Sequence, residues 1–321
     1  MRRLAVVVAR DPRCVRGQRG CARARRVPEL ARVVDAGLGG ARYDARSLTP
    51  ARPPHVRLLR LILVLCLFVA AAVLALRWLE PRLVFVPTRG PVGTGPGERV
   101  ELVTPDGVRL VAWWLPRAGS DAAVLYLHGN GGNLLGREPV LRGIAEAAHS
   151  SVLALDWRGY GESEGRPSEA GIYVDARTGW DWLAARVAPE RIAIWGESLG
   201  AGAATFLARA VERPGVPRAL VVQSAFTSIP DMAPRALPIP GIRWLCGIRL
   251  DNLERVGAIR CWKLFVHSRA DEIVPFEMGE RLFEAASEPK QSLWLDRVGH
   301  NETWNDAAFV SRLAAQLSRL P

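Results

Sequence analysis

The sequence predicts an α/β protein whose central sheet is mostly parallel and covered by helices on both faces. Three observations predict this class. Short apolar runs recur from residue 123 onward, stretches of helical length separate them, and an alternating hairpin precedes them. Apolar runs that alternate with helices are typical of parallel strands buried on both faces. The expected strands are Ala123–Leu127, Val152–Leu155, Ile192–Trp195, Ala219–Val222, Leu264–Val266 and Leu293–Leu295.

The composition excludes several other classes of protein. With 49% hydrophobic residues and 11 Trp, the chain has enough apolar side chains to form a core. Its five Cys do not form a disulfide framework, and none has the C-x-x-C spacing of a zinc site. We therefore expect a folded protein with no metal and no cofactor.

Residues 1–57 differ in composition from the rest of the chain. They carry 14 Arg and four acidic residues, so they hold +10 of the net charge of +11. The remainder is near neutral, which argues against a nucleic-acid-binding domain. We expect a disordered basic arm, and one hypothesis is that translation begins after it, at a non-Met codon near Val56. The alternative is an arm that binds anionic lipid or nucleic acid.

An apolar run from Leu61 to Leu76 predicts a membrane anchor. Extended to residues 58–79, it gives about 33 Å of helix, which is enough to cross a bilayer core of about 30 Å. A cleaved signal peptide with a cut near residues 70–72 is the alternative, but the apolar region is long for one. Because the Arg-rich side precedes the run, we expect a single-pass protein with its N-terminus in the cytosol. The rest of the chain then lies on the outer side, which in a bacterium is the periplasm.

Residues 80–321 are expected to form one domain. It begins with a hairpin, Glu98–Val103 and Val108–Leu115, around the turn sequence of residues 105–107. The last helix has a clear helical period, with one apolar stripe formed by Phe309, Leu313, Leu317 and Leu320.

The sequence Gly196-Glu197-Ser198-Leu199-Gly200 follows an expected strand and precedes a helix of small residues. Gly-x-Ser-x-Gly in this context is the pattern of a nucleophile elbow, a strained turn that exposes a serine hydroxyl above the sheet. Side chains at Gly196 and Gly200 would clash with the neighbouring strand and helix. Ser198 is therefore the expected nucleophile.

A second motif, residues 125–133, joins an apolar strand to a Gly-rich loop that begins at His128 and Gly129. It lacks both the Gly-Lys-Ser/Thr ending and the G-x-G-x-x-G spacing of phosphate-binding loops. Such a loop can instead offer backbone N–H groups to an oxyanion. The expected donors are the N–H groups of Leu199 and Asn130.

Together these motifs resemble the α/β-hydrolase superfamily, and most closely a membrane-anchored branch of single-domain serine hydrolases of the aminopeptidase or esterase kind. The resemblance covers about residues 78–320. It rests on residues 78–87, the His128-Gly129-Asn130 sequence, residues 156–165, the elbow and two C-terminal motifs. It implies an α/β-hydrolase fold with one N-terminal transmembrane helix.

The resemblance also implies a triad in the chain order serine, acid, histidine. Asp271 stands where the family has its acid, although Ser268 replaces the usual Gly of that loop. Glu272 and Asp296 are the alternatives. His300, after the last strand, has the order and context of the base, whereas the remaining histidines are His55 in the arm, His149 at a helix end, and His128 and His267 in loop motifs.

Other parts of these motifs have a structural interpretation. Residues 156–165 are expected to fix a loop beside the active site, and Glu197 to hydrogen-bond nearby loops. Residues 226–256 contain an apolar, Pro-rich stretch that predicts a short lid over the serine. The alternative is that these side chains only pack on the domain. In an oxidising compartment, Cys246 and Cys261 could form a disulfide bracing the lid.

The expected function is hydrolysis of a carboxylic ester or thioester by a membrane-anchored serine hydrolase. An apolar lid on a tethered enzyme favours a lipid-like substrate. A peptidase or amidase with the same triad is the alternative. A non-catalytic binding module is a further one, since fold does not imply function. The sequence leaves the oligomeric state open.

Overall fold

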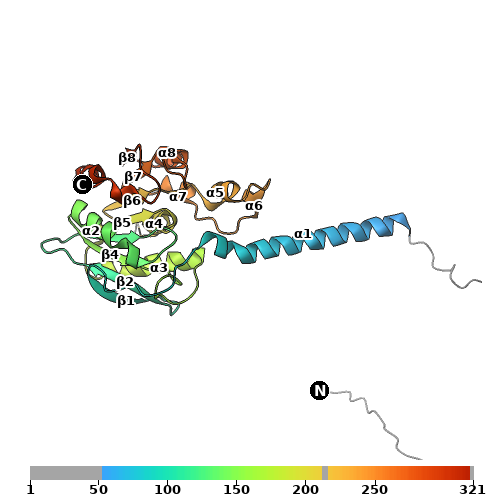
Figure 1. Cartoon of the computed structure of the whole chain (residues 1–321), viewed down its shortest axis with the longest axis horizontal. Helices are drawn as coiled ribbons and strands as arrows, with labels where there is room; N and C mark the ends of the chain where they lie inside the picture. The colour runs from blue at the N-terminus through green and yellow to red at the C-terminus, as the bar shows by residue number, and fades with distance from the viewer. Residues whose placement is uncertain (1–52, 212–215, 319–321) are drawn as a thin grey trace, which may run out of the picture. The chain divides into compact units, whose positions relative to one another are not determined.

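The computed structural model describes residues 53–211 and 216–318 (Figure 1). The predictions for the basic arm up to residue 52, and for Leu320 in the last helix, lie outside the described residues.

Eight strands form one sheet in the described part of the chain, in the order β1-β2-β4-β3-β5-β6-β7-β8. β1 and β2 form the predicted antiparallel hairpin, β2 pairs antiparallel with β4, and all other neighbours are parallel. This confirms the predicted fold class. The strands are β1 (Glu98–Val103), β2 (Arg109–Leu115), β3 (Ala123–Leu127), β4 (Ser151–Leu155), β5 (Ile192–Glu197), β6 (Ala219–Gln223), β7 (Trp262–Ser268) and β8 (Lys290–Leu295).

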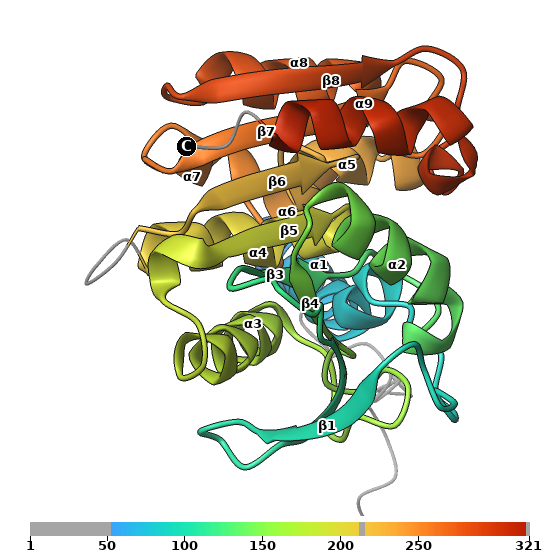
Figure 2. The same cartoon turned by 90° about the vertical axis from the view of Figure 1, so that its left-hand side faces the viewer.

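Helices cover both faces of this sheet (Figure 2). On one face, α2 (Glu138–Ala147) contacts α9 (Ala307–Leu317), and their apolar side chains join one buried cluster with the strands. On the other face, neighbouring helices contact one another in the order α3 (Glu169–Ala184), α4 (Leu199–Ala210), α7 (Asn252–Val256) and α8 (Phe276–Ala285). The stripe on α9 points inward, because Phe309, Leu313 and Leu317 are all buried. Each face of the sheet therefore has its own hydrophobic core.

The helix α1 (Pro54–Val84) has 31 residues and contains the predicted membrane segment 58–79. Of the helices that the structure describes, it alone is long and apolar enough to cross a membrane. Most of its side chains are exposed. Apart from Val56 in the first turn, the exceptions before its last turn are Val73, Leu76 and Glu80, which are spaced three and four residues apart. They therefore lie on one stripe, which faces the rest of the protein.

The segment between β6 and β7, which we call the lid, contains α5 (Ile229–Ala236), α6 (Ile242–Leu245) and α7. Ser228 caps α5 by accepting a hydrogen bond from the Asp231 N–H. Cys246 and Cys261 are not bonded to each other. Cys261 packs in the core beneath the sheet, whereas Cys246 lines a cavity under the lid, so the considered disulfide is not present.

Candidate active site

Ser198 lies at the sharp turn between β5 and α4. Its φ is 51° and its ψ is −114°, a strained combination that a non-glycine residue rarely adopts. The turn needs its glycines, because a Cβ at Gly196 would clash with Ala201 and Ala204 of α4. A Cβ at Gly200 would clash with the Leu127 carbonyl of β3. The small residues of this motif thus allow the strained turn that presents the serine.

Three of the predicted side chains meet at the carboxyl edge of the sheet. Ser198 follows β5, Asp271 follows β7 and His300 follows β8. The His300 Nε2 lies 3.1 Å from the Ser198 Oγ, and the His300 Nδ1 lies 2.7 Å from the Asp271 Oδ2. Because an ionised carboxylate only accepts hydrogen bonds, the Nδ1 carries the proton and the Nε2 is free to accept one from the serine hydroxyl.

Asp271 is held firmly as an anion. Its Oδ1 accepts hydrogen bonds from the backbone N–H groups of Ile273 and Val274. Burial raises the pKa of this carboxyl, but hydrogen bonds from His267 and His300 lower it more, so the net pKa is well below its usual range. An ionised Asp271 favours the imidazole tautomer described above.

The two alternative acids are placed differently. Glu272 accepts a hydrogen bond from the backbone N–H of His300 at 3.0 Å, so it steadies the loop and not the ring. Asp296 is exposed and lies 3.5 Å from Arg269. Among the described residues, the His300 ring is hydrogen-bonded to Asp271 and Ser198 and to neither of these two carboxylates.

The remaining histidines have other partners. The His128 ring is buried, 2.7 Å from the Gly129 carbonyl and 3.3 Å from Asp156. The His267 Nε2 lies 3.0 Å from the Val274 carbonyl and 3.2 Å from Asp271. His149 contacts Arg117 at the surface, and His55 lies at the start of α1.

Of the two predicted oxyanion donors, Leu199 belongs to the elbow itself, and Asn130 follows Gly129, which lies against Ser198 and Glu197. Leu199 is the first residue of α4, so its N–H has no acceptor within the helix. The Asn130 side chain fixes its loop by donating to the Val84 carbonyl at 2.6 Å and accepting from the Val86 N–H at 2.9 Å. The Tyr160 hydroxyl donates to the same Asn130 oxygen. This loop is therefore tied directly to the end of α1.

A buried ionic cluster supports the elbow from within. The Glu197 carboxylate accepts hydrogen bonds from the Tyr126 hydroxyl and, at 3.1 Å, from Arg137. Sequence reasoning expected Glu197 to contact nearby loops but did not identify Arg137. Arg137 belongs to no recognisable sequence motif, so its contact with Glu197 could not be predicted. It lies in a short 3₁₀ helix before α2.

The residues 156–165 make structural contacts. The Asp156 side chain accepts a hydrogen bond from the Leu134 N–H, and Arg158 bridges Asp106 and Asp175. These contacts join the loop to α3 and to the β1–β2 turn.

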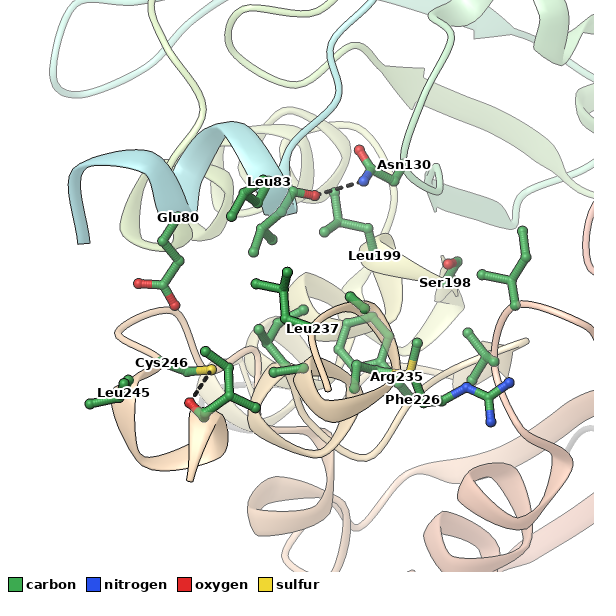
Figure 3. A pocket seen from close by; sticks show the side chains of 18 of the residues that line it. Glu80, Leu83, Asn130, Ser198, Leu199, Phe226, Arg235, Leu237, Leu245 and Cys246 are labelled. Atoms are coloured by element: carbon green, nitrogen blue, oxygen red, sulfur yellow. Dashed lines mark hydrogen bonds between the residues drawn. The ribbon is translucent and has the colours of Figure 1, made fainter. Parts of the chain in front are cut away.

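A cavity of about 490 Å³ opens beside Ser198 (Figure 3). Leu83 of α1 lines one side, and Leu237 and Cys246 of the lid line the other. Its lining is mainly apolar, and its size is within the usual range for small-molecule sites. In the described part of the chain, no group of three His, Cys, Asp or Glu side chains is placed to hold a metal ion.

Comparisons with known proteins agree with this architecture. The family model described as "alpha/beta hydrolase fold" matches residues 122–241. An uncharacterized protein of Mycobacterium tuberculosis strain H37Rv is 39% identical over 75% of this chain and 88% of its own length. The lysophosphatidylserine lipase ABHD12 of Macaca fascicularis is 38% identical over 53% of this chain, which spans about half of that protein (46%).

Among solved structures, an esterase of Pyrococcus furiosus superposes with a TM-score of 0.57. It is 24% identical and covers 71% of this chain and 93% of its own, so the likeness concerns the fold. The chain belongs to the α/β-hydrolase family.

Proposed function

We propose that the protein is a membrane-anchored serine hydrolase that cleaves carboxylic ester or thioester bonds through Ser198, His300 and Asp271. The observation that carries this proposal is the continuous line of hydrogen bonds from Asp271 through His300 to Ser198. It ends at a strained elbow that opens onto an apolar cavity.

Acylation begins when the Ser198 Oγ attacks the substrate carbonyl and His300 Nε2 takes the hydroxyl proton. Asp271 stabilises the imidazolium that forms. The N–H groups of Leu199 and Asn130 bind the oxyanion, and the loss of one such donor typically costs about 2.7–4 kcal/mol of transition-state stabilisation. His300 then gives its proton to the leaving alcohol or thiol, which leaves an acyl ester on Ser198.

Deacylation repeats these steps with water. His300 takes a proton from the water, whose oxygen attacks the acyl carbonyl, and the proton passes to Ser198 as the carboxylic acid leaves. All atoms of the overall hydrolysis are supplied by the substrate and one water molecule.

Two findings support a lipid-like substrate. The cavity beside Ser198 is lined mainly by apolar side chains. The Macaca relative is named as a lysophosphatidylserine lipase. We therefore take a single-chain acyl ester as the substrate class.

The membrane placement is part of the same proposal. Residues 58–79 of α1 cross the bilayer, the N-terminus is cytosolic, and the hydrolase domain lies on the outer side. The Arg-rich composition before α1 supports this orientation through the positive-inside rule.

The test is turnover of an ester, a thioester and an amide with the same acyl group by the full chain in detergent. We expect hydrolysis of the ester and thioester, with a loss of about a thousandfold or more in Ser198→Ala. Faster turnover of the amide would favour a peptidase or amidase. A folded wild type that hydrolyses none of the three would contradict the proposal and favour a binding module.

A further inference from the structure

The last turns of α1 contribute directly to the cavity that contains Ser198. Leu76, Glu80, Leu83 and Val84 all line it. Leu76 belongs to the apolar run expected to lie in the bilayer, whereas Val84 is bonded through its carbonyl to the Asn130 loop. One wall of the cavity therefore extends from the membrane segment to the catalytic serine.

The opposite wall comes from the lid. Leu237, at the end of α5, lies across the cavity from Leu83 of α1 (Figure 3). Met232 of α5 and Leu245 of α6 line the same cavity. Their side chains are apolar, as are those of Leu76, Leu83 and Val84 on α1. A cavity with apolar side chains on both sides suits a hydrocarbon chain, whose burial is favourable by about 0.8 kcal/mol per CH₂.

Glu80 holds these two walls together. Its side chain is 10% exposed, and its carboxylate accepts hydrogen bonds from the N–H groups of Gly247 and Ile248 at 2.7–2.9 Å. Arg77, one turn earlier, lies 3.7 Å from the same carboxylate. A Cβ at position 247 would meet the guanidinium end of Arg77, so the two segments approach closely here. The lid is thus fastened to α1 and not only to the globular domain.

The lid also exposes an apolar surface. Trp244 is 79% exposed and Ile239 is 53% exposed, although both are large apolar residues. On α1, Trp78 is exposed close to Leu76 and carries Arg82 over its ring. Tryptophan and arginine in such positions are typical of the membrane–water interface. These residues indicate that the lid and the adjacent part of α1 lie at the bilayer surface.

We propose that the last turns of α1 are a substrate-binding element: with the lid they form a site for one acyl chain, which reaches Ser198 from the bilayer. The substrate class is then a membrane-resident, single-chain ester. This inference rests on the proposed function, because it assumes that Ser198 attacks the ester at the end of that chain.

The test uses the full chain in phosphatidylcholine vesicles with p-nitrophenyl butyrate and palmitate as substrates. Leu76→Trp fills the membrane end of the cavity and leaves the Ser198 end open. We expect the ratio of kcat/KM for palmitate to that for butyrate to fall by about tenfold, the scale of a lost apolar subsite. This ratio does not depend on the fraction of folded enzyme in a preparation.

Leu74→Trp is the matched control, since Leu74 lies two residues away, is 70% exposed and does not line the cavity. Its palmitate-to-butyrate ratio should equal that of the wild type. Ala236→Trp provides a second variant on the lid side, where the exposed Ala236 lines the same cavity, and should lower the ratio like Leu76→Trp.

An unchanged ratio in both Leu76→Trp and Ala236→Trp, with hydrolysis still dependent on Ser198, would overturn the acyl-chain site and leave the proposed function standing. Hydrolysis that persists in Ser198→Ala would defeat the proposed function and the inference together.

Discussion

Asp271 is the residue on which the geometry of the site depends most. Its Oδ2 faces two imidazole rings, His300 at 2.7 Å and His267 at 3.2 Å, while its Oδ1 accepts two backbone N–H groups. Each contact favours the charged carboxylate. The charge in turn fixes the proton of His300 on Nδ1.

Asp271→Asn should lower kcat by about 10³–10⁴-fold, because an amide can donate to Nδ1 and favour the wrong tautomer. Substrate binding should change little, so KM should stay near its wild-type value. Steady-state ester hydrolysis measures both constants. Asp296→Asn, at an exposed carboxylate, is the control and should keep the wild-type kcat.

The same carboxylate links stability to pH. Its pKa in the folded protein is below the unfolded value of about 3.9, so it stabilises the fold above that pH. The contribution is lost as the pH falls further. We therefore expect the free energy of unfolding of the wild type to decrease relative to that of Asp271→Asn below about pH 4. Urea unfolding of both proteins at a series of pH values would show a constant difference if this linkage is wrong.

At the scale of elements, a buried ion pair connects the start of α2 to the elbow. Arg137 and Glu197 have side chains that are 16% and 8% exposed. Arg137→Leu would leave Glu197 buried without its cation, which should destabilise the protein by about 3–5 kcal/mol. Chemical unfolding in detergent measures this change.

The matched control is Arg142→Leu on α2, which removes an exposed pair with Glu138. This substitution should lower the free energy of unfolding by no more than about 1 kcal/mol. Equal losses in the two variants would contradict a supporting role for the buried pair.

A second element-scale contact fastens α1 to the lid. Glu80→Ala would leave the buried Ile248 N–H and the Gly247 N–H without their acceptor, which should cost about 1–3 kcal/mol. The lid should also become more sensitive to limited proteolysis. Glu98→Ala, at an exposed position of β1, should change neither property; unchanged lid cleavage in Glu80→Ala would argue against the contact.

The core strands could be predicted from the sequence because their apolar runs are continuous and local. The run Ala123–Leu127 is a strand with the predicted bounds, and the other core strands extend the predicted runs by one or more residues. Asp271 and His300 were assigned through the resemblance to the α/β-hydrolase superfamily. They meet Ser198 because all three residues follow parallel strands, which end at a common edge of the sheet.

The supporting contacts could not be predicted in the same way. Glu80 resembles a charge at the end of a membrane helix, and its partners lie 167 and 168 residues later in a segment without a motif. Arg137 likewise stands in no pattern, although it pairs with the residue before Ser198. Such pairs form only when segments far apart in the sequence fold over the site. The local periodicity of a sequence carries no information about these contacts.

For the whole molecule, the proposed topology places the hydrolase domain on the outer side of the membrane. In spheroplasts of a bacterial host, Asp296→Cys should react with a membrane-impermeant maleimide without lysis, because Asp296 is exposed on the domain. His55→Cys, at the other end of α1, should react only after lysis. The reverse pattern would show the opposite orientation.

The most direct test of the central claim is labelling of membranes that contain the full chain with a fluorophosphonate probe. The account predicts labelling of the wild type and of Ser311→Ala, whose serine lies on the surface of α9, and none of Ser198→Ala or His300→Ala. Labelling that persists in Ser198→Ala, or its absence from folded wild type, would contradict an activated serine at the elbow.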